Sequence, residues 1–79
     1  MKPLDDRVPL DTKSLVALRE SRGLTPSQMA GAFGGAENTY RAIEAGERDP
    51  KLSQVLAILK ILGLRIEDLP KLLRKEWRF

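Results

Sequence analysis

Glycine and proline divide this chain into segments that fit only short secondary-structure elements. Thr25 followed by Pro26 is a strong helix start, because a threonine hydroxyl can cap the helix and proline at its first position loses no hydrogen bond. Gly34 and Gly35 then interrupt the helical pattern, and Gly46 ends the segment that follows. The sequence therefore predicts two short helices, one ending near residue 33 and one ending at residue 44, joined by a tight turn.

Similar signals in the rest of the chain predict an all-α fold of five helices with no strand. A first helix is expected over about residues 13–22, capped by Asp11 or Thr12 and ended by Gly23. Apolar residues at helical spacing predict a fourth helix that Gly63 ends and a short fifth one that is interrupted or restarted at Pro70. We expect residues 1–12 to be a flexible arm, residues 13–69 the folded domain, and residues 70–79 a basic amphipathic tail.

Apolar residues on the inner sides of these helices predict a single hydrophobic core. The expected core consists of Leu15, Leu18, Met29, Ala30, Phe33, Ile43, Leu52, Val55, Leu59, Leu62 and Leu69. Tyr40 is expected to be buried in part, whereas Ile61 falls away from the core on its helix. Leu69, Leu72, Leu73 and Trp77 form a further stripe that could pack on the core, form a dimer interface, or bind a partner protein or a membrane surface.

Composition excludes several classes of function. The chain has 79 residues, which allow one domain, and it has no cysteine and no histidine. Disulfides, thiol nucleophiles and zinc sites with nitrogen or sulfur ligands are therefore excluded. The adjacent carboxylates Asp5-Asp6 and Glu67-Asp68 suit surface positions, so we expect no enzymatic activity, no cofactor and no metal. No apolar stretch is long enough to span a bilayer and no signal sequence is evident, so a cytoplasmic location is expected.

Charge is distributed unevenly along the chain. The formal net charge is +3, and residues 52–79 contribute +3 of it. Residues 13–23 carry +2, whereas residues 24–51 carry −1. Because Lys and Arg supply most non-specific affinity for DNA, basic groups outside residues 24–51 would have to contribute if this segment binds DNA.

Residues 18–50 contain nearly every element of a known family pattern at the right spacing. The pattern is carried by Leu18-Arg19, Arg22-Gly23-Leu24-Thr25, Met29-Ala30, Ile43-Glu44, Gly46, Arg48 and Pro50. In these residues the chain resembles the Cro/repressor (XRE) type of helix-turn-helix protein. The resemblance covers about residues 13–69. It implies a five-helix lambda-repressor-like DNA-binding domain whose third helix reads the major groove.

The resemblance also implies roles for individual residues. Arg19 and Glu44 occupy positions where the family commonly has a partly buried ion pair that links the first and third helices. Glu37, Asn38 and Arg41 occupy the first turns of the third helix, from which the family reads bases. Asn can bind adenine, Arg can bind guanine, and Glu can accept from cytosine. Glu37 could alternatively repel the phosphates.

Four further residues are candidate DNA contacts. Thr39 and Gln28 could bind phosphates, and Arg48 and Lys51 could add positive charge after the third helix. Polar residues on an exposed helix face can also lack any function, so this alternative stays open for all the candidate contacts.

Two functions follow from these observations. The first is a sequence-specific transcriptional regulator, either a repressor or an antitoxin that regulates its own operon. It would bind double-stranded DNA as a homodimer formed through the fourth helix and the tail, with a toxin or the transcription machinery as a further partner. The second is a protein-interaction module of the same fold that does not read DNA. The −1 charge of residues 24–51 and the carboxylate of Glu37 favour the second function.

Overall fold

The computed structural model describes residues 7–74, which form four α-helices and one 3-10 helix. The elements are α1 (Thr12–Ser21), α2 (Pro26–Ala32), α3 (Glu37–Glu44), α4 (Leu52–Ile61) and η1 (Ile66–Leu72). Over residues 7–74 the only β pairing consists of two isolated bridges. The prediction of an all-α fold with five helices is confirmed.

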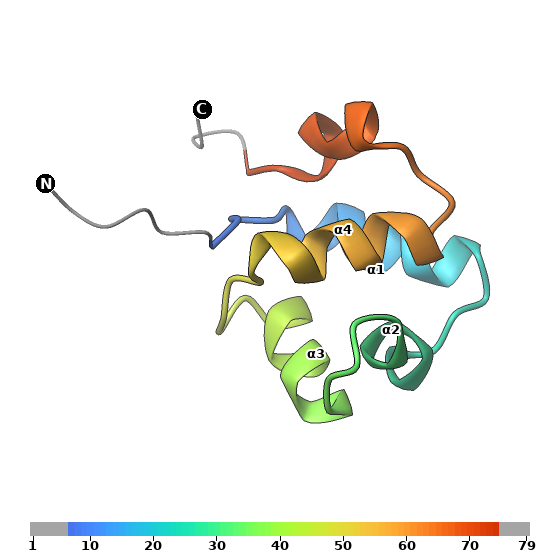
Figure 1. Cartoon of the computed structure of the whole chain (residues 1–79), viewed down its shortest axis with the longest axis vertical. Coiled ribbons are helices and arrows are strands. Elements are labelled where there is room, and N and C mark those ends of the chain that lie inside the picture. Colours follow the sequence, from blue (N-terminus) through green and yellow to red (C-terminus); the bar gives the residue numbers. More distant parts are fainter. Residues whose placement is uncertain (1–6, 75–79) are drawn as a thin grey trace, which may run out of the picture.

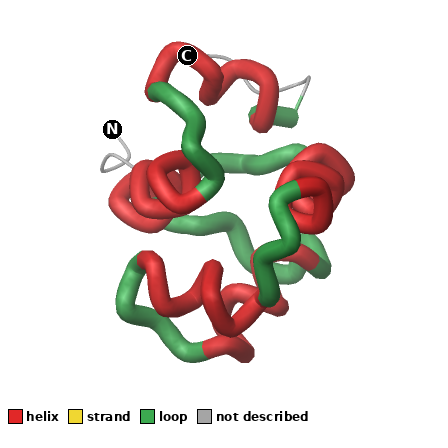
Figure 2. The backbone as a smooth tube through the Cα atoms, turned by 90° about the vertical axis from the view of Figure 1, so that its right-hand side faces the viewer, coloured by secondary structure: helices red, strands yellow, loops and turns green. Residues whose placement is uncertain are grey.

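The helices are arranged in three tiers. Figure 1 shows α1 and α4 in the middle, with α2 and α3 on one side of them and η1 on the other. Figure 2 shows the same order after a turn of 90°. α2 packs against α3 and α4, α3 packs against α1, and η1 contacts α1 and α4. One side of the α2–α3 pair therefore faces away from the rest of the protein.

Side-chain caps define the starts of α1 and α2. The Asp11 carboxylate accepts hydrogen bonds from the backbone amide and the hydroxyl of Ser14, at 3.4 and 2.9 Å. Thr25 and Gln28 form a reciprocal capping box, in which the amide of each residue donates to the side chain of the other. Of the two predicted caps of the first helix, Asp11 is the observed one and Thr12 is the first helical residue, and the predicted start at Thr25-Pro26 is confirmed.

The turn between α2 and α3 depends on two glycines for different reasons. Gly34 has φ of +69°, a conformation that side chains rarely adopt. A Cβ atom on Gly35 would lie 2.2 Å from the Phe33 ring, so the missing side chain makes room for that ring. Ala36 follows as the N-cap of α3 and offers no side-chain hydrogen bond, as its residue type predicts.

The core contains most of the predicted residues and several others. Leu15, Met29, Ala30, Ile43, Val55, Leu59, Leu62 and Leu69 are buried as predicted, while Leu18 and Phe33 are partly buried against the core. Tyr40 was expected to be only partly buried but is fully buried, and Ile58 and Leu72 are fully buried too. Ile61 was expected to face outward, but it packs partly against the core.

Leu52 was wrongly predicted to belong to the core, since it is 43% exposed. It is the first residue of α4, and helical side chains tilt toward the N-terminus of their helix. A side chain at this position therefore tilts away from the body of α4. Leu56, four residues later, is also exposed at 41%. The inner side of α4 is formed by Val55, Ile58 and Leu59 instead.

The predicted boundary of the N-terminal arm at residue 12 does not coincide with the edge of the core. Val8 and Leu10 are buried, and Leu10 forms an isolated antiparallel bridge with Leu73. The Val8 amide donates to the Pro50 carbonyl at 2.8 Å, and the Arg74 amide donates to the Pro9 carbonyl at 3.0 Å. Residues 7–11 are thus an ordered part of the fold. The apolar residues at positions 8 and 10 were the signal from which an extended segment with one buried side could have been predicted.

The C-terminal end of the domain also lies beyond the predicted boundary at residue 69. η1 continues through Pro70 to the fully buried Leu72, so the expected interruption at this proline is wrong. Pro70 is the fifth of the seven residues of this 3-10 helix, so it removes one amide donor from the element without ending it. Leu73 is partly buried against the core. Trp77, the last residue of the predicted apolar stripe, lies outside the described residues.

Candidate nucleic-acid interface

Three polar side chains fix the inner side of α3 to α1. Arg19 Nε donates to Glu44 Oε2 at 2.5 Å, and Arg19 Nη2 donates to Glu44 Oε1 at 3.4 Å. Arg19 Nη1 donates to the Leu24 carbonyl at 2.9 Å, in the loop that precedes α2. The Tyr40 hydroxyl donates to Glu44 Oε2 at 2.5 Å. The Glu44 carboxylate therefore joins α3 to α1, and Arg19 extends the cluster to the loop before α2.

Burial makes this cluster a strong constraint on the orientation of α3. The side chains of Arg19 and Glu44 are 13% and 15% exposed. The hydrogen bond to Glu44 raises the pKa of Arg19, so the guanidinium stays charged. Burial, together with the neighbouring Glu44 carboxylate, raises the pKa of Tyr40, so its hydroxyl remains a donor. Sequence reasoning missed Tyr40, although its i,i+4 spacing from Glu44 was a usable signal.

The outer side of α3 carries three of the predicted base-reading residues. Arg41 and Asn38 are exposed, and Glu37 is half-buried. Arg41 Nε donates to Glu37 Oε2 at 2.6 Å, and Arg41 Nη2 lies 2.6 Å from the same oxygen. Arg41 also borders a shallow depression together with Pro26, at the start of α2. The exposed side of α3 and the start of α2 thus form one continuous surface.

Gln28 and Thr39, the two predicted phosphate contacts on α2 and α3, differ in exposure. Gln28 is exposed on α2, but its side-chain oxygen accepts a hydrogen bond from the Thr25 amide at 2.8 Å. The side-chain NH2 group of Gln28 is not used by this bond and is the group that would donate to a phosphate. Thr39 is half-buried on α3. Thr39 is therefore less exposed than Asn38 and Arg41, whereas Gln28 is exposed as they are.

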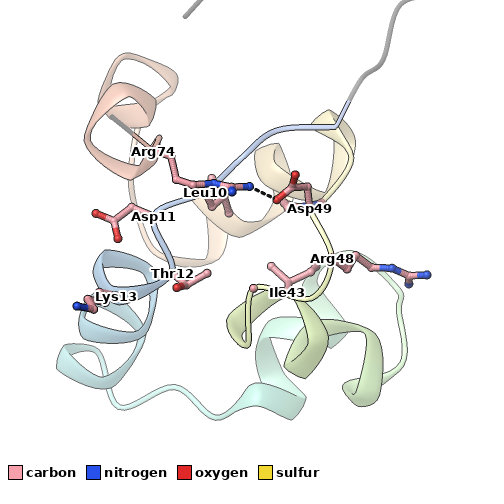
Figure 3. A pocket seen from close by; sticks show the side chains of 10 residues that line it. Leu10, Asp11, Thr12, Lys13, Ile43, Arg48, Asp49 and Arg74 are labelled. Carbon is pink, nitrogen blue, oxygen red and sulfur yellow. Dashed lines mark hydrogen bonds and ion pairs between the residues drawn. The ribbon is translucent and has the colours of Figure 1, made fainter. Parts of the chain in front are cut away.

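Arg48 and Lys51 lie in the loop between α3 and α4, which is tied to both ends of the described chain. Arg74 Nη2 binds Asp49 Oδ1 at 2.5 Å, and Arg7 Nη1 donates to the Asp49 carbonyl at 2.9 Å. Figure 3 shows Arg74 directed at Asp49, whereas Arg48 points away from both. Arg48 and Lys51 are exposed. Both cations thus project from a loop that is fixed at Asp49.

Ion pairs with residues outside the segment neutralise much of the acidity of residues 24–51. Of its four carboxylates, Glu44 is paired with Arg19 and Asp49 with Arg74, and both arginines lie outside the segment. Adding these two positive charges to the −1 of residues 24–51 gives a formal charge of +1. The folded unit is therefore mildly basic, although its linear sequence is mildly acidic.

Comparisons with known proteins identify the family. The family described as "Helix-turn-helix domain" matches residues 14–72. The chain belongs to this helix-turn-helix family. The match confirms the resemblance drawn from the sequence, and α2 and α3 are the two helices joined by the glycine-containing turn.

This chain is also similar to a phage protein. The "Cryptic phage CTXphi transcriptional repressor RstR" of Vibrio cholerae is 38% identical over 52 residues, which are 66% of this chain and 47% of the repressor. The matched region thus spans about half the length of that relative. No solved structure matches this chain.

Two further observations concern the described part of the helix-turn-helix chain. None of the helices between residues 7 and 74 is long and apolar enough to cross a membrane. The same residues contain no group of three or more His, Cys, Asp or Glu side chains placed to hold a metal ion.

Proposed function

We propose that this protein is a sequence-specific DNA-binding transcriptional regulator, acting as a repressor or as an antitoxin that represses its own operon. In this proposal α3 enters the major groove. The observation that supports this proposal most is that the two sides of α3 differ. Its inner side is held to α1 through Glu44, while its outer side exposes Asn38 and Arg41. The proposed function requires no cofactor and no catalytic step.

The similarity to a phage transcriptional repressor supports this proposal. Asn38 and Arg41 are the proposed base contacts, because Asn can bind adenine and Arg can bind guanine through two hydrogen bonds each. Arg48 and Lys51 are proposed to bind phosphates at the end of α3, where they are exposed. Gln28 and Thr39 are proposed as secondary phosphate contacts.

We further propose that two copies bind together. Leu52 and Leu56 lie one turn apart on α4 and are 43% and 41% exposed, which suits an apolar contact between two copies. A two-fold dimer would place two copies of α3 in successive turns of the major groove. The bound sequence should then be a palindrome with half-site centres about 10 base pairs apart.

A protein-interaction module remains the alternative function. The exposed apolar residues support it, since Ile66 is 67% exposed in addition to Leu52 and Leu56. A toxin or a component of the transcription machinery would be the partner. This alternative predicts a folded protein that has no affinity for DNA at low salt.

Selection from a pool of randomised DNA duplexes tests the regulator proposal. The wild-type protein should enrich one palindromic sequence, and Arg41→Ala should lose discrimination at one base pair of each half-site. Lys71→Ala is the matched control, because Lys71 is exposed on η1, in the tier opposite α2 and α3. It should enrich the wild-type sequence. Enrichment of no sequence by a folded wild-type protein would refute the proposal.

The salt dependence of affinity tests the phosphate contacts separately. Lys51→Ala should weaken binding to the selected duplex and to unrelated duplexes about equally. Because the proposed dimer carries two copies of Lys51, the substitution should also reduce the slope of log affinity against log salt by about 2, which is about 1 for each lost phosphate contact. Lys71→Ala should leave the slope unchanged. Equal slopes for wild type and Lys51→Ala would show that Lys51 does not contact a phosphate.

A further inference from the structure

The ion pair between Glu37 and Arg41 uses only one edge of the arginine. Arg41 Nε and Nη2 both contact Glu37 Oε2, at 2.6 Å each. These two nitrogens form the side edge of the planar guanidinium. The end edge, formed by Nη1 and the outer hydrogen of Nη2, is not used by this contact. It presents two parallel N–H donors.

A guanine in the major groove requires such a pair of donors. Its O6 and N7 atoms accept two hydrogen bonds from one arginine. Since Glu37 occupies the side edge, it does not compete with guanine for the end edge. We propose that Glu37 is a positioning residue that holds Arg41 for reading a guanine, and that it does not read a base itself. This inference rests on the proposed function, in which α3 enters the major groove.

Positioning matters here because Arg41 is otherwise little constrained. The Arg41 side chain is 61% exposed, and an exposed arginine loses considerable rotamer freedom when it is fixed on a ligand. Holding it before binding removes part of this loss. Glu37 precedes Arg41 by four residues, which is the favourable order for a helical pair.

Glu37 is also the carboxylate that is available to Arg41. Glu44 borders the same surface depression as Arg41, but its carboxylate already accepts hydrogen bonds from Arg19 and Tyr40. Pro26, which also borders the depression, has no hydrogen-bonding side chain. The pair with Arg41 in addition neutralises the charge of Glu37, which would otherwise repel DNA phosphates.

Affinity measurements on the duplex selected by the wild-type protein test this inference. The base pair at which Arg41→Ala loses discrimination is replaced by each of the other three. Wild type should prefer guanine there by about 5- to 150-fold. Glu37→Ala should reduce this preference at least about threefold. Glu37→Gln should retain it within about twofold, because the glutamine oxygen can still accept from Nε and Nη2.

Glu47→Ala is the matched control. Glu47 is exposed in the loop after α3, so its replacement removes the same charge. This variant should change the affinity for all four duplexes by the same factor and leave the guanine preference unchanged. The thermal midpoints of all variants, followed by circular dichroism, should show that each is folded at the assay temperature.

Three results would overturn the inference. If Glu37→Ala and Glu37→Gln both bind all duplexes more tightly and keep the guanine preference, Glu37 only repels DNA. If Glu37→Gln changes the preference at a base pair that Arg41→Ala does not affect, Glu37 itself reads a base. If the wild-type protein selects no duplex at all, the proposed function fails, and the inference fails with it. The first two results leave the proposed function intact.

Discussion

Replacing Glu44 by leucine should be among the most damaging single changes in this protein. The Glu44 carboxylate accepts two hydrogen bonds from Arg19 and one from Tyr40. Without it, Arg19 would keep only its bond to the Leu24 carbonyl, and the fully buried Tyr40 would lose the partner of its hydroxyl. A charged guanidinium with few partners would then remain in a site where it is 13% exposed.

The expected loss of stability in Glu44→Leu follows from the burial of the Arg19–Glu44 ion pair. Removing one member of a buried ion pair costs about 3–5 kcal/mol, and the remaining exposure of 13% and 15% favours the lower limit, about 3 kcal/mol. The unpaired Tyr40 hydroxyl adds about 1 kcal/mol. A domain of 79 residues has a total stability of about 4–12 kcal/mol. Arg19→Met combined with Glu44→Leu should cost less than Glu44→Leu alone, because no charge is left without a partner.

Urea denaturation followed by circular dichroism measures this difference. Wild type, both single variants and the double variant form a cycle, which is best run with Tyr40→Phe throughout so that the hydroxyl does not contribute. The cycle should give a coupling free energy of about 1.5 kcal/mol or more. Glu47→Leu, an exposed control, should change stability by less than about 0.5 kcal/mol. Coupling below about 0.5 kcal/mol would refute the structural role of the pair.

Three further predictions concern stability. Leu72→Ala should cost about 2–5 kcal/mol because Leu72 is fully buried, whereas Leu52→Ala should cost less than about 1 kcal/mol; equal losses in urea denaturation would contradict the observed packing. Ala36→Ser should raise the thermal midpoint by supplying the N-cap that α3 lacks, worth about 1 kcal/mol; an unchanged midpoint would count against this. Hydrogen bonds from Ser14 lower the pKa of Asp11 below 3.8, so its stabilising contribution is complete above about pH 4 and is lost as the pH falls through the lowered pKa. Asp11→Asn should therefore make stability less sensitive to acid below about pH 4, and an identical pH profile would refute this.

Local signals in the sequence predicted most of the helices, because each depends on a few adjacent residues. Thr25-Pro26 marked the start of α2, and Gly46 marked the end of α3. The absence of a side-chain cap at Ala36 followed from its residue type alone. The core on the inner side of each helix was also largely predictable, since apolar residues three and four apart must share one face.

Features that depend on distant segments could not be derived in this way. The spacing of Val8 and Leu10 could indicate an extended segment with one buried side, but it does not indicate that residues 7–11 lie against residues 50 and 72–74. The ion pair between Asp49 and Arg74 spans 25 residues and makes the folded unit more basic than its linear sequence. At the candidate site the sequence identified Glu37 and Arg41 separately, whereas their contact required the orientation of both side chains.

The position of α3 in the major groove is the central claim, and modified guanines test it directly. In the duplex selected by the wild-type protein, each guanine is replaced in turn by 7-deazaguanine, which lacks the N7 acceptor of the major groove. We predict that one replacement per half-site lowers the affinity of the wild-type protein about 5-fold or more and does not affect Arg41→Ala. The account would be contradicted if no 7-deazaguanine lowered the affinity while inosine, which lacks the minor-groove amino group, did.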